Sequence, residues 1–242
     1  MYIAILNLNG TISRGMLNSY MPALKYIEKK NKVKGLLLVI NSGGGDANST
    51  EILYNQLAKI SGKKPVYALI EGVGASGAYW LACSAEKIFA MRTSIVGSIG
   101  VISMSLDFSK FLENIGIKMR INKIGKYKDM NSPFRNMTDE ENKIYTGIMN
   151  DIYLAFRDEV KKRRNFTEEK LDDIATGLVF SAEQAKGNGL IDGIGNIDTV
   201  MDQFRERTGT TSLKNLTPKR PLISRVMSMS MEALSGIVDD VR

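Results

Sequence analysis

Apolar residues along this chain gather into short continuous runs, separated by segments with helical spacing. Three runs, at residues 2–8, 33–40 and 65–70, have the length of strands. A run that is apolar throughout, such as the second, is typical of a parallel strand that is covered on both faces. Helices are expected between the runs, at residues 16–30 and 49–60. Alternating strands and helices predict an α/β domain.

The next strand is predicted at residues 87–90, and the C-terminal third is expected to be mainly helical. A capping box at residues 138–141 opens a long helix with apolar residues every four positions, from Ile144 to Val160. The shorter elements expected are helices at 78–83, 108–115, 167–175, from 181 and at 198–207, and a strand at 119–122. We therefore expect one domain over residues 1–210, followed by a tail, 211–242, that is flexible or binds a partner.

Two glycine-rich segments follow predicted strands, where the ligands of α/β proteins bind. The first, Asn41–Asp46, contains three consecutive glycines, which free the backbone to approach a ligand. The second, Glu71–Trp80, places Ser76 in a turn between a strand and a helix, with its hydroxyl beside the first N–H groups of that helix. A serine nucleophile needs access to a carbonyl carbon and donors for the oxyanion. The alternative is a tight turn built for close packing.

The same stretch also matches a dinucleotide-binding fingerprint, Gly72-x-Gly74-x-x-Gly77. That fingerprint includes an acidic residue about 20 positions further on, at the end of the next strand. Here the strand at 87–90 is followed by Met91-Arg92-Thr93-Ser94, which contains no carboxylate. The sequence therefore argues against a nucleotide, and no cofactor is expected.

Composition excludes several kinds of catalysis. The chain of 242 residues contains no histidine and one cysteine, Cys83. Ser-His-Asp and Cys-His catalysis, His-ligated or Cys-rich metal sites and an internal disulfide are therefore excluded within this chain. A serine nucleophile would need Lys, Asp, Glu or Tyr as its base, and Ser-Lys pairing is the known arrangement that works without histidine.

The formal charge of +7 comes with short, dispersed basic runs at residues 29–32, 161–164 and 219–220. We expect these to be solvated helix ends, where cations are favourable, and no nucleic-acid partner; association with an anionic membrane surface stays open. No apolar run reaches 18 residues, and residues 1–8 lack the basic segment of a signal peptide. The protein is expected to be soluble and cytoplasmic, or membrane-associated if an anchor was removed from this chain.

Four motifs together resemble the signal peptide peptidase A family of Ser-Lys serine proteases. They are Asn41-Ser42-Gly43-Gly44-Gly45, Gly74–Tyr79, Val96–Val101, and Tyr127-Lys128-Asp129 with Ser132-Pro133 and Arg135. The resemblance covers about residues 2–205. It implies a Clp-protease/crotonase-like fold, in which αβ units wind around a spiral sheet. It also implies a serine endopeptidase that hydrolyses apolar peptides such as cleaved signal peptides.

The resemblance assigns roles to individual residues. It makes Ser76 the nucleophile, Lys128 the general base, Ser98 the residue that holds the lysine amine, and the N–H groups of Gly45 and Gly77 the oxyanion hole. Burial lowers the pKa of a lysine because desolvation disfavours the charged form, and a neutral amine can then accept a proton. Without the motif, Lys126 would be as good a choice as Lys128.

Two features depart from the family pattern. Gly43 stands where the family has proline, which loosens the loop before Gly45, and the family's N-terminal membrane anchor is not found in this chain. The resemblance also implies a closed homo-oligomer, a ring or dome such as an octamer, in which the lysine of one subunit meets the serine of its neighbour. Alternatives are a phage capsid- or scaffold-processing protease of the same fold, a crotonase-type acyl-CoA enzyme, and a non-catalytic dinucleotide-binding module.

Overall fold

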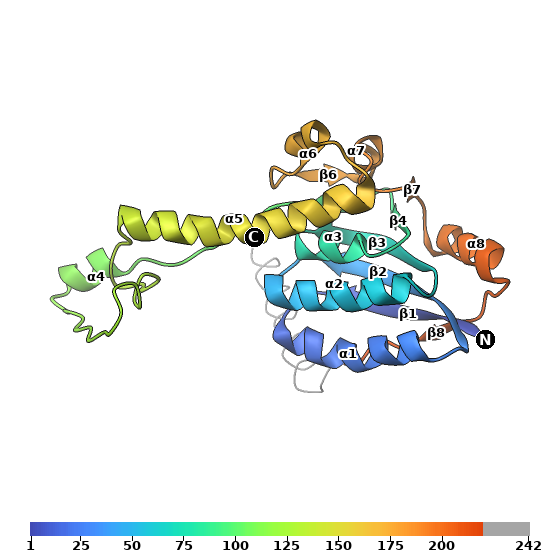
Figure 1. The fold of residues 1–242 in the computed structure, drawn as a ribbon, viewed down its shortest axis with the longest axis horizontal. Helices are drawn as coiled ribbons and strands as arrows, with labels where there is room; N and C mark the ends of the chain where they lie inside the picture. Colours follow the sequence, from blue (N-terminus) through green and yellow to red (C-terminus); the bar gives the residue numbers. More distant parts are fainter. Residues whose placement is uncertain (220–242) are drawn as a thin grey trace, which may run out of the picture.

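A computed structural model describes residues 1–219, which fold around one eight-stranded sheet (Figure 1). The strands lie in the order β6-β5-β3-β2-β1-β8, with β4 paired to β3 and β7 beside this row. All pairs are parallel except β5 with β6. In chain order the elements are β1 (Tyr2–Asn9), α1 (Arg14–Lys29), β2 (Val33–Ser42), α2 (Ala47–Ser61), β3 (Val66–Ala75), α3 (Gly77–Ala82), β4 (Lys87–Ala90), β5 (Ile95–Gly97), α4 (Ser109–Asn114), α5 (Asp139–Arg164), α6 (Glu168–Ile174), β6 (Val179–Ser181), α7 (Ala182–Gly187), β7 (Gly193–Ile194), α8 (Ile197–Thr208) and β8 (Leu213–Asn215).

Alternating side chains along the central strands divide the core between the two faces of the sheet. Leu38 points to the face that α1, α2 and α3 cover, within the larger buried cluster. Its neighbour Leu37 points to the other face and packs in a cluster with Tyr67 and Phe204 of α8, whose rings lie 4.4 Å apart. Both faces of β2 are therefore buried, which explains why residues 33–40 form a continuous apolar run.

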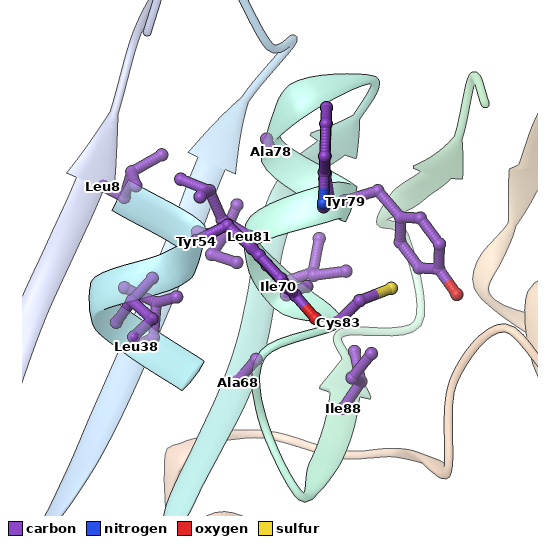
Figure 2. Close-up of a cluster of buried hydrophobic side chains, with 14 of the residues drawn as sticks. Leu8, Leu38, Tyr54, Ala68, Ile70, Ala78, Tyr79, Leu81, Cys83 and Ile88 are labelled. Atoms are coloured by element: carbon purple, nitrogen blue, oxygen red, sulfur yellow. The ribbon is translucent and has the colours of Figure 1, made fainter. Parts of the chain in front are cut away.

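Helix α3 is part of this core. Figure 2 shows Tyr79 and Leu81 of α3 and the adjoining Cys83 within the cluster that also holds Ile70 of β3. The Tyr79 hydroxyl donates to the backbone oxygen of Leu190 at 2.8 Å, so its one buried polar atom is satisfied. Burial raises the pKa of the Cys83 thiol to about 12. Cys83 is therefore a small, inert core residue.

Strand β3 changes partner along its length. Residues 67–70 pair with β4, whereas residues 73–75 pair with β5. Between these two halves the register of β3 against β2 shifts, as in a β-bulge. The Asn41 side chain holds the shift in place, because its Oδ1 accepts a hydrogen bond from the Val73 N–H at 3.1 Å. The bulge directs the end of β3, and with it Ser76, toward β5.

The structure corrects several details of the expected elements. Residues 71–75, expected as part of a turn, continue strand β3, so the junction before α3 is the single residue Ser76. The strand expected at residues 119–122 is absent, because this segment is exposed and no strand of the described chain pairs with it. Three strands of two or three residues, β6, β7 and β8, lie in the C-terminal third that was expected to be helical.

Strand β8 lies just beyond residue 210, where the domain was predicted to end. It pairs in parallel with β1, and the Asn7 N–H donates to Thr217 Oγ1 at 2.9 Å. The chain after residue 210 thus starts with residues that belong to the sheet. Residues 220–242, the remainder of the expected tail, lie outside the described residues.

A long arm projects from the body of the domain (Figure 1). It consists of residues 101–138, including α4, and the first turns of α5; only the second half of α5 is anchored, through the buried Phe156 and Val160. Large apolar side chains are exposed along the arm: Ile102, Met104, Leu106, Phe108, Phe111, Ile115, Ile117, Met119, Ile121, Ile124, Phe134, Ile144 and Ile148. Although α5 has 26 residues, no helix of the described chain combines the length and apolarity of a membrane span.

Candidate active site

Ser76 occupies the junction between β3 and α3 in a strained conformation. Its φ of 52° lies in the left-handed region, which costs a residue other than glycine about 1–3 kcal/mol. The backbone fixes it from both sides: its N–H donates to Gly97 O at 2.8 Å, and its carbonyl accepts from Trp80 N at 3.0 Å. Its hydroxyl makes no helix-cap hydrogen bond. The fold therefore holds Ser76 rigidly while it leaves the hydroxyl free to react.

The glycine loop after β2 lies directly against this junction. Gly44 has a φ of 99°, and a Cβ atom on it would come within 2.8 Å of both Ser76 Cβ and Gly77 N. A Cβ atom on Gly45, whose φ is 154°, would meet the backbone oxygen of Ile12 at 2.1 Å. The sequence predicted that glycines would let the backbone approach another group closely at this loop. In the structure the groups approached are other backbone segments, at Ile12 and at Ser76–Gly77.

Ile12 ties the glycine loop to the end of β1. Its N–H donates to Gly44 O and its carbonyl accepts from Asp46 N, both at 2.9 Å. These two hydrogen bonds involve the residues before and after Gly45, but not the Gly45 N–H itself. Within residues 1–219, neither the N–H of Gly45 nor that of Gly77 has an acceptor. Two residues with unused backbone donors, Gly45 and Gly77, thus line the same cavity as Ser76, and an oxyanion is stabilised by donors of this kind.

Two adjoining cavities open onto Ser76. The smaller, of about 330 Å³, is bounded by Gly45 and Gly77 and is mostly apolar; we call it the apolar pocket. The larger, of about 750 Å³, also reaches Gly45 and contains Ser98; we call it the Ser98 pocket. The structure therefore brings together Ser76, Ser98, Gly45 and Gly77, four of the five residues to which the motifs gave roles.

Aromatic and aliphatic side chains that the sequence did not single out line the apolar pocket. Trp80 stacks on Phe156 of α5, with ring centroids 5.0 Å apart, and its indole N–H is buried without a partner among the described residues. Ile152 and Ile148, about one and two turns before Phe156 on α5, also contribute. The spacing by four along α5 predicted an amphipathic helix, but not that part of its apolar face would border Ser76.

Ser98 shows the same backbone device as Ser76. It follows β5 directly with a φ of 50°, and its N–H donates to Leu178 O at 2.7 Å. The residue before it, Gly97, accepts the hydrogen bond from Ser76 N, so a main-chain hydrogen bond links the segments that carry the two serines. Both line the Ser98 pocket, where Ser98 can contact a group that approaches Ser76.

Lys128 is the residue that the structure does not bring to Ser76. It lies between α4 and α5 on the arm, which Figure 1 shows extending away from α3. Its side chain is exposed, and it lines neither the apolar pocket nor the Ser98 pocket. Among the residues that the structure describes, no acceptor is bonded to its amine.

Lys126, the alternative that spacing left open, is engaged elsewhere. Its amine bonds Glu140 at 2.6 Å, and this hydrogen bond raises the pKa of Lys126. This ion pair favours the charged form of Lys126, which is the form that cannot act as a base. Lys126 and Lys128 thus differ in their local contacts, a difference that the sequence pattern does not contain.

Arg135 holds the loop that carries Lys128 against the start of α5. Its guanidinium bonds Asp129 at 2.9 Å and Glu141 at 2.6–2.8 Å. Arg135 first, and the Thr138 backbone N–H second, lower the pKa of Glu141 to about 2. Glu141 also completes the capping box of α5 with Thr138. The loop is thus fastened at the residue that follows Lys128.

The glycines of the dinucleotide fingerprint have a packing explanation. Gly72 and Gly74 lie within β3, where a Cβ atom would come within 2.6 Å of Asn41 and Ile70, respectively. Helix α3, which would have to receive a pyrophosphate, is six residues long and buried. Within residues 1–219 there is no group of three His, Cys, Asp or Glu residues that could hold a metal ion.

Comparison with known proteins identifies relatives over most of the chain. Residues 58–211 match the model of peptidase family S49. The chain is 37% identical to a "Putative protease" of Methanocaldococcus jannaschii, over 77% of this chain and 60% of the relative. It is 34% identical to a "Putative signal peptide peptidase" of Enterococcus faecium, over 80% of this chain and 56% of that protein. The chloroplastic serine protease SPPA of Arabidopsis thaliana is 28% identical, over 99% of this chain and 37% of the relative. The chain thus spans somewhat more than half the length of the first two.

The close approach of the glycine loop to Ser76 generates a prediction. Gly44→Ala should lower kcat for peptide hydrolysis by roughly 100-fold or more, since a Cβ atom there displaces Gly77 and the oxyanion donors beside it. Gly43→Ala is the matched control, because a Cβ atom on Gly43 meets nothing within 4 Å. Steady-state kinetics on a fluorogenic peptide compare the two. Equal activity of both variants would contradict the proposed geometry.

Proposed function

Because the chain belongs to peptidase family S49, we propose that it is a serine endopeptidase whose catalytic pair is Ser76 and Lys128. The observation that carries the proposal is the environment of Ser76. A strained, rigidly held serine opens onto two cavities, one of which it shares with Gly45 and Gly77, whose backbone N–H groups are unused. This arrangement fits acyl transfer, in which an oxyanion forms on the carbon that the nucleophile attacks.

The proposed reaction follows from these positions. Ser76 Oγ attacks the scissile carbonyl carbon while a neutral lysine amine accepts its proton, and the Gly45 and Gly77 N–H groups bind the resulting oxyanion. The protonated amine then donates to the leaving nitrogen, which releases one peptide and leaves an acyl ester on Ser76. Water, deprotonated by the same amine, attacks the ester, and the protonated amine then returns this proton to Ser76 Oγ as the second peptide leaves. Ser98 holds the amine in position for each of these proton transfers.

The residues of the same chain that line the cavities at Ser76 do not offer a general base. Asp46 and two tyrosines are the ionisable residues that line the two cavities. Asp46 caps α2 through the Ser49 N–H, and hydrogen bonds from Ser49 lower the pKa of Asp46, which makes it a weak base. Tyr145 is hydrogen-bonded to Ser103 at 2.7 Å. The site is therefore consistent with a base that comes from a residue outside these two cavities.

We infer that the base comes from a second copy of the chain. Lys128 is exposed on an arm whose apolar side chains have no cover among the described residues, and such a surface is typical of a protein interface. An arm that reaches the site of the next subunit makes a head-to-tail contact, which closes into a ring or dome if the rotation permits. The apolar arm would then bury its surface and deliver Lys128 to the neighbour's Ser76. An octamer is one such assembly.

The apolar pocket suggests the class of substrate. Trp80, Ile148, Ile152 and Phe156 offer a peptide side chain an apolar surface beside Ser76. A charged side chain would lose its hydration there without gaining a partner. These features support apolar peptides, such as cleaved signal peptides, as substrates.

Substitution of the catalytic pair tests the assignment. Ser76→Ala and Lys128→Ala should each reduce peptide hydrolysis by roughly a thousandfold or more, and Lys128→Arg should be equally inactive because arginine stays protonated. Lys126→Ala is the control and should retain activity, since Lys126 pairs with Glu140. Thermal denaturation checks that each variant is folded. Full activity of Ser76→Ala would refute the nucleophile, and full activity of Lys128→Ala would refute the base.

Substrate preference can be measured separately with a peptide library. The residue next to the cut bond should be small or aliphatic, because the apolar pocket excludes unpaired charge. Each charged residue at this position should lower kcat/KM by roughly tenfold or more. A preference for Lys, Arg, Asp or Glu there would contradict this use of the pocket.

Mixing of inactive variants tests whether subunits share a catalytic pair. Ser76→Ala and Lys128→Ala proteins are dissociated, mixed and reassembled, and mixed oligomers are verified by differential tagging. A shared pair restores activity wherever an intact Ser76 receives an intact Lys128 from its neighbour. Oligomers of either variant alone are the controls and should remain inactive. Verified mixed oligomers without activity would show that the pair forms within one chain.

A further inference from the structure

Seven lysines form a continuous patch at one end of the domain. The lysine patch consists of Lys30, Lys32, Lys34, Lys59, Lys63, Lys64 and Lys214. These residues come from the ends of α1 and α2, the start of β2, the loop before β3, and β8. The basic run at residues 29–32, which the sequence favoured as a solvated helix end, is thus only one part of a larger basic surface.

Hydrogen bonds connect one half of the patch through Lys64. Its amine donates to the backbone oxygens of Ile27 and Lys30, at 2.6 and 2.8 Å, which fixes it at the end of α1. Burial first, and the nearby charge of Lys34 second, lower the pKa of Lys64. Glu28 is the carboxylate within this group, and it pairs with Lys63 at 2.5 Å. One negative charge therefore offsets several positive ones.

Two tyrosines connect the other half. The amines of Lys30 and Lys32 lie over the ring of Tyr26, 5.9 and 5.8 Å from its centroid. Lys214 lies over the ring of Tyr2 at 5.5 Å, and the hydroxyls of Tyr2 and Tyr26 are 3.4 Å apart. The patch therefore runs without a break from α2, across the end of α1, to β8.

The patch lies at the opposite end of the sheet from Ser76. Parallel strands share one direction, and the patch surrounds the amino ends of β1 and β2, whereas Ser76 follows the carboxyl end of β3. Figure 1 shows the start of β1 and the ends of α1 and α2 on one side of the body, and the arm projecting from the other. A surface bound at the patch would leave the cavities around Ser76 and the arm unobstructed.

We propose that the lysine patch binds the anionic surface of a lipid membrane. Lysine is a compact, hydrated charge suited to diffuse attraction toward lipid headgroups, and each one near such a surface adds to the affinity. Exposed apolar residues accompany the charges: Met1 is 78% exposed and Leu213 41%. Basic residues beside apolar residues and tyrosine hydroxyls are the combination that membrane–water interfaces favour.

The same features argue against nucleic acid as the partner. The patch contains only lysine, whereas the planar fork of arginine is the group that pairs bidentately with phosphates and bases. Single strands are also bound by stacking on aromatic rings. Here the rings of Tyr2 and Tyr26 already have lysine amines as neighbours, 5.5–5.9 Å from the ring centroids.

Vesicle co-sedimentation of the full chain tests the proposal. Wild type should bind vesicles of phosphatidylglycerol and phosphatidylcholine, bind pure phosphatidylcholine much less, and dissociate at high salt. Lys32→Gln combined with Lys214→Gln should weaken binding to the anionic vesicles by roughly 10- to 30-fold. The matched control is Lys162→Gln with Lys186→Gln, which removes the same charge from exposed positions on α5 and α7 and should have little effect.

Two further measurements separate the outcomes. Both double variants should cleave a soluble peptide at the wild-type rate, because neither pair lies near Ser76, so the result does not depend on the proposed catalytic pair. Binding to a single-stranded RNA oligonucleotide is measured in parallel. The proposal would be overturned by an absence of vesicle binding, by equal weakening in both variants, or by binding to RNA without binding to vesicles.

Discussion

The candidate site depends on the contact between two backbone segments that leave no room for a side chain. The loop at Gly44 and Gly45 lies against the junction at Ser76 and Gly77, and hydrogen bonds to Ile12 hold the loop there. Strand β3 supplies the other half, since its bulge turns the junction toward β5 and Ser98. Because both segments are fixed by main-chain hydrogen bonds, the glycine loop and Ser76 are held in place before any substrate arrives.

Much of this arrangement could be predicted from the sequence. Continuous apolar runs located the central strands, and the glycines around Ser76 indicated a strand-to-helix junction, as observed. The family resemblance drawn from four motifs is confirmed by the match to peptidase family S49, and with it the Clp-protease/crotonase-like α/β fold. The junction can be recognised from the local sequence because glycine at a positive φ and small residues are required wherever two backbone segments approach closely.

Features that depend on distant partners could not be predicted. Strand β8 has three exposed residues and exists because β1 lies beside it, about 210 positions earlier in the chain. The segment at 119–122 has a strand-like composition but no partner in the described chain. The wall that α5 contributes to the apolar pocket likewise follows from its path across the body. The residue pattern of one segment does not show which distant segment packs beside it, and that contact decides its structure and function.

The position of Lys128 on a projecting arm has a consequence for the cell that makes this protein. Under the proposed pairing, nucleophile and base are held apart in each newly folded chain, so a lone subunit is a latent enzyme. Proteolysis would begin only once enough copies have accumulated to associate. The concentration of the protein in the cell would then decide when proteolysis starts.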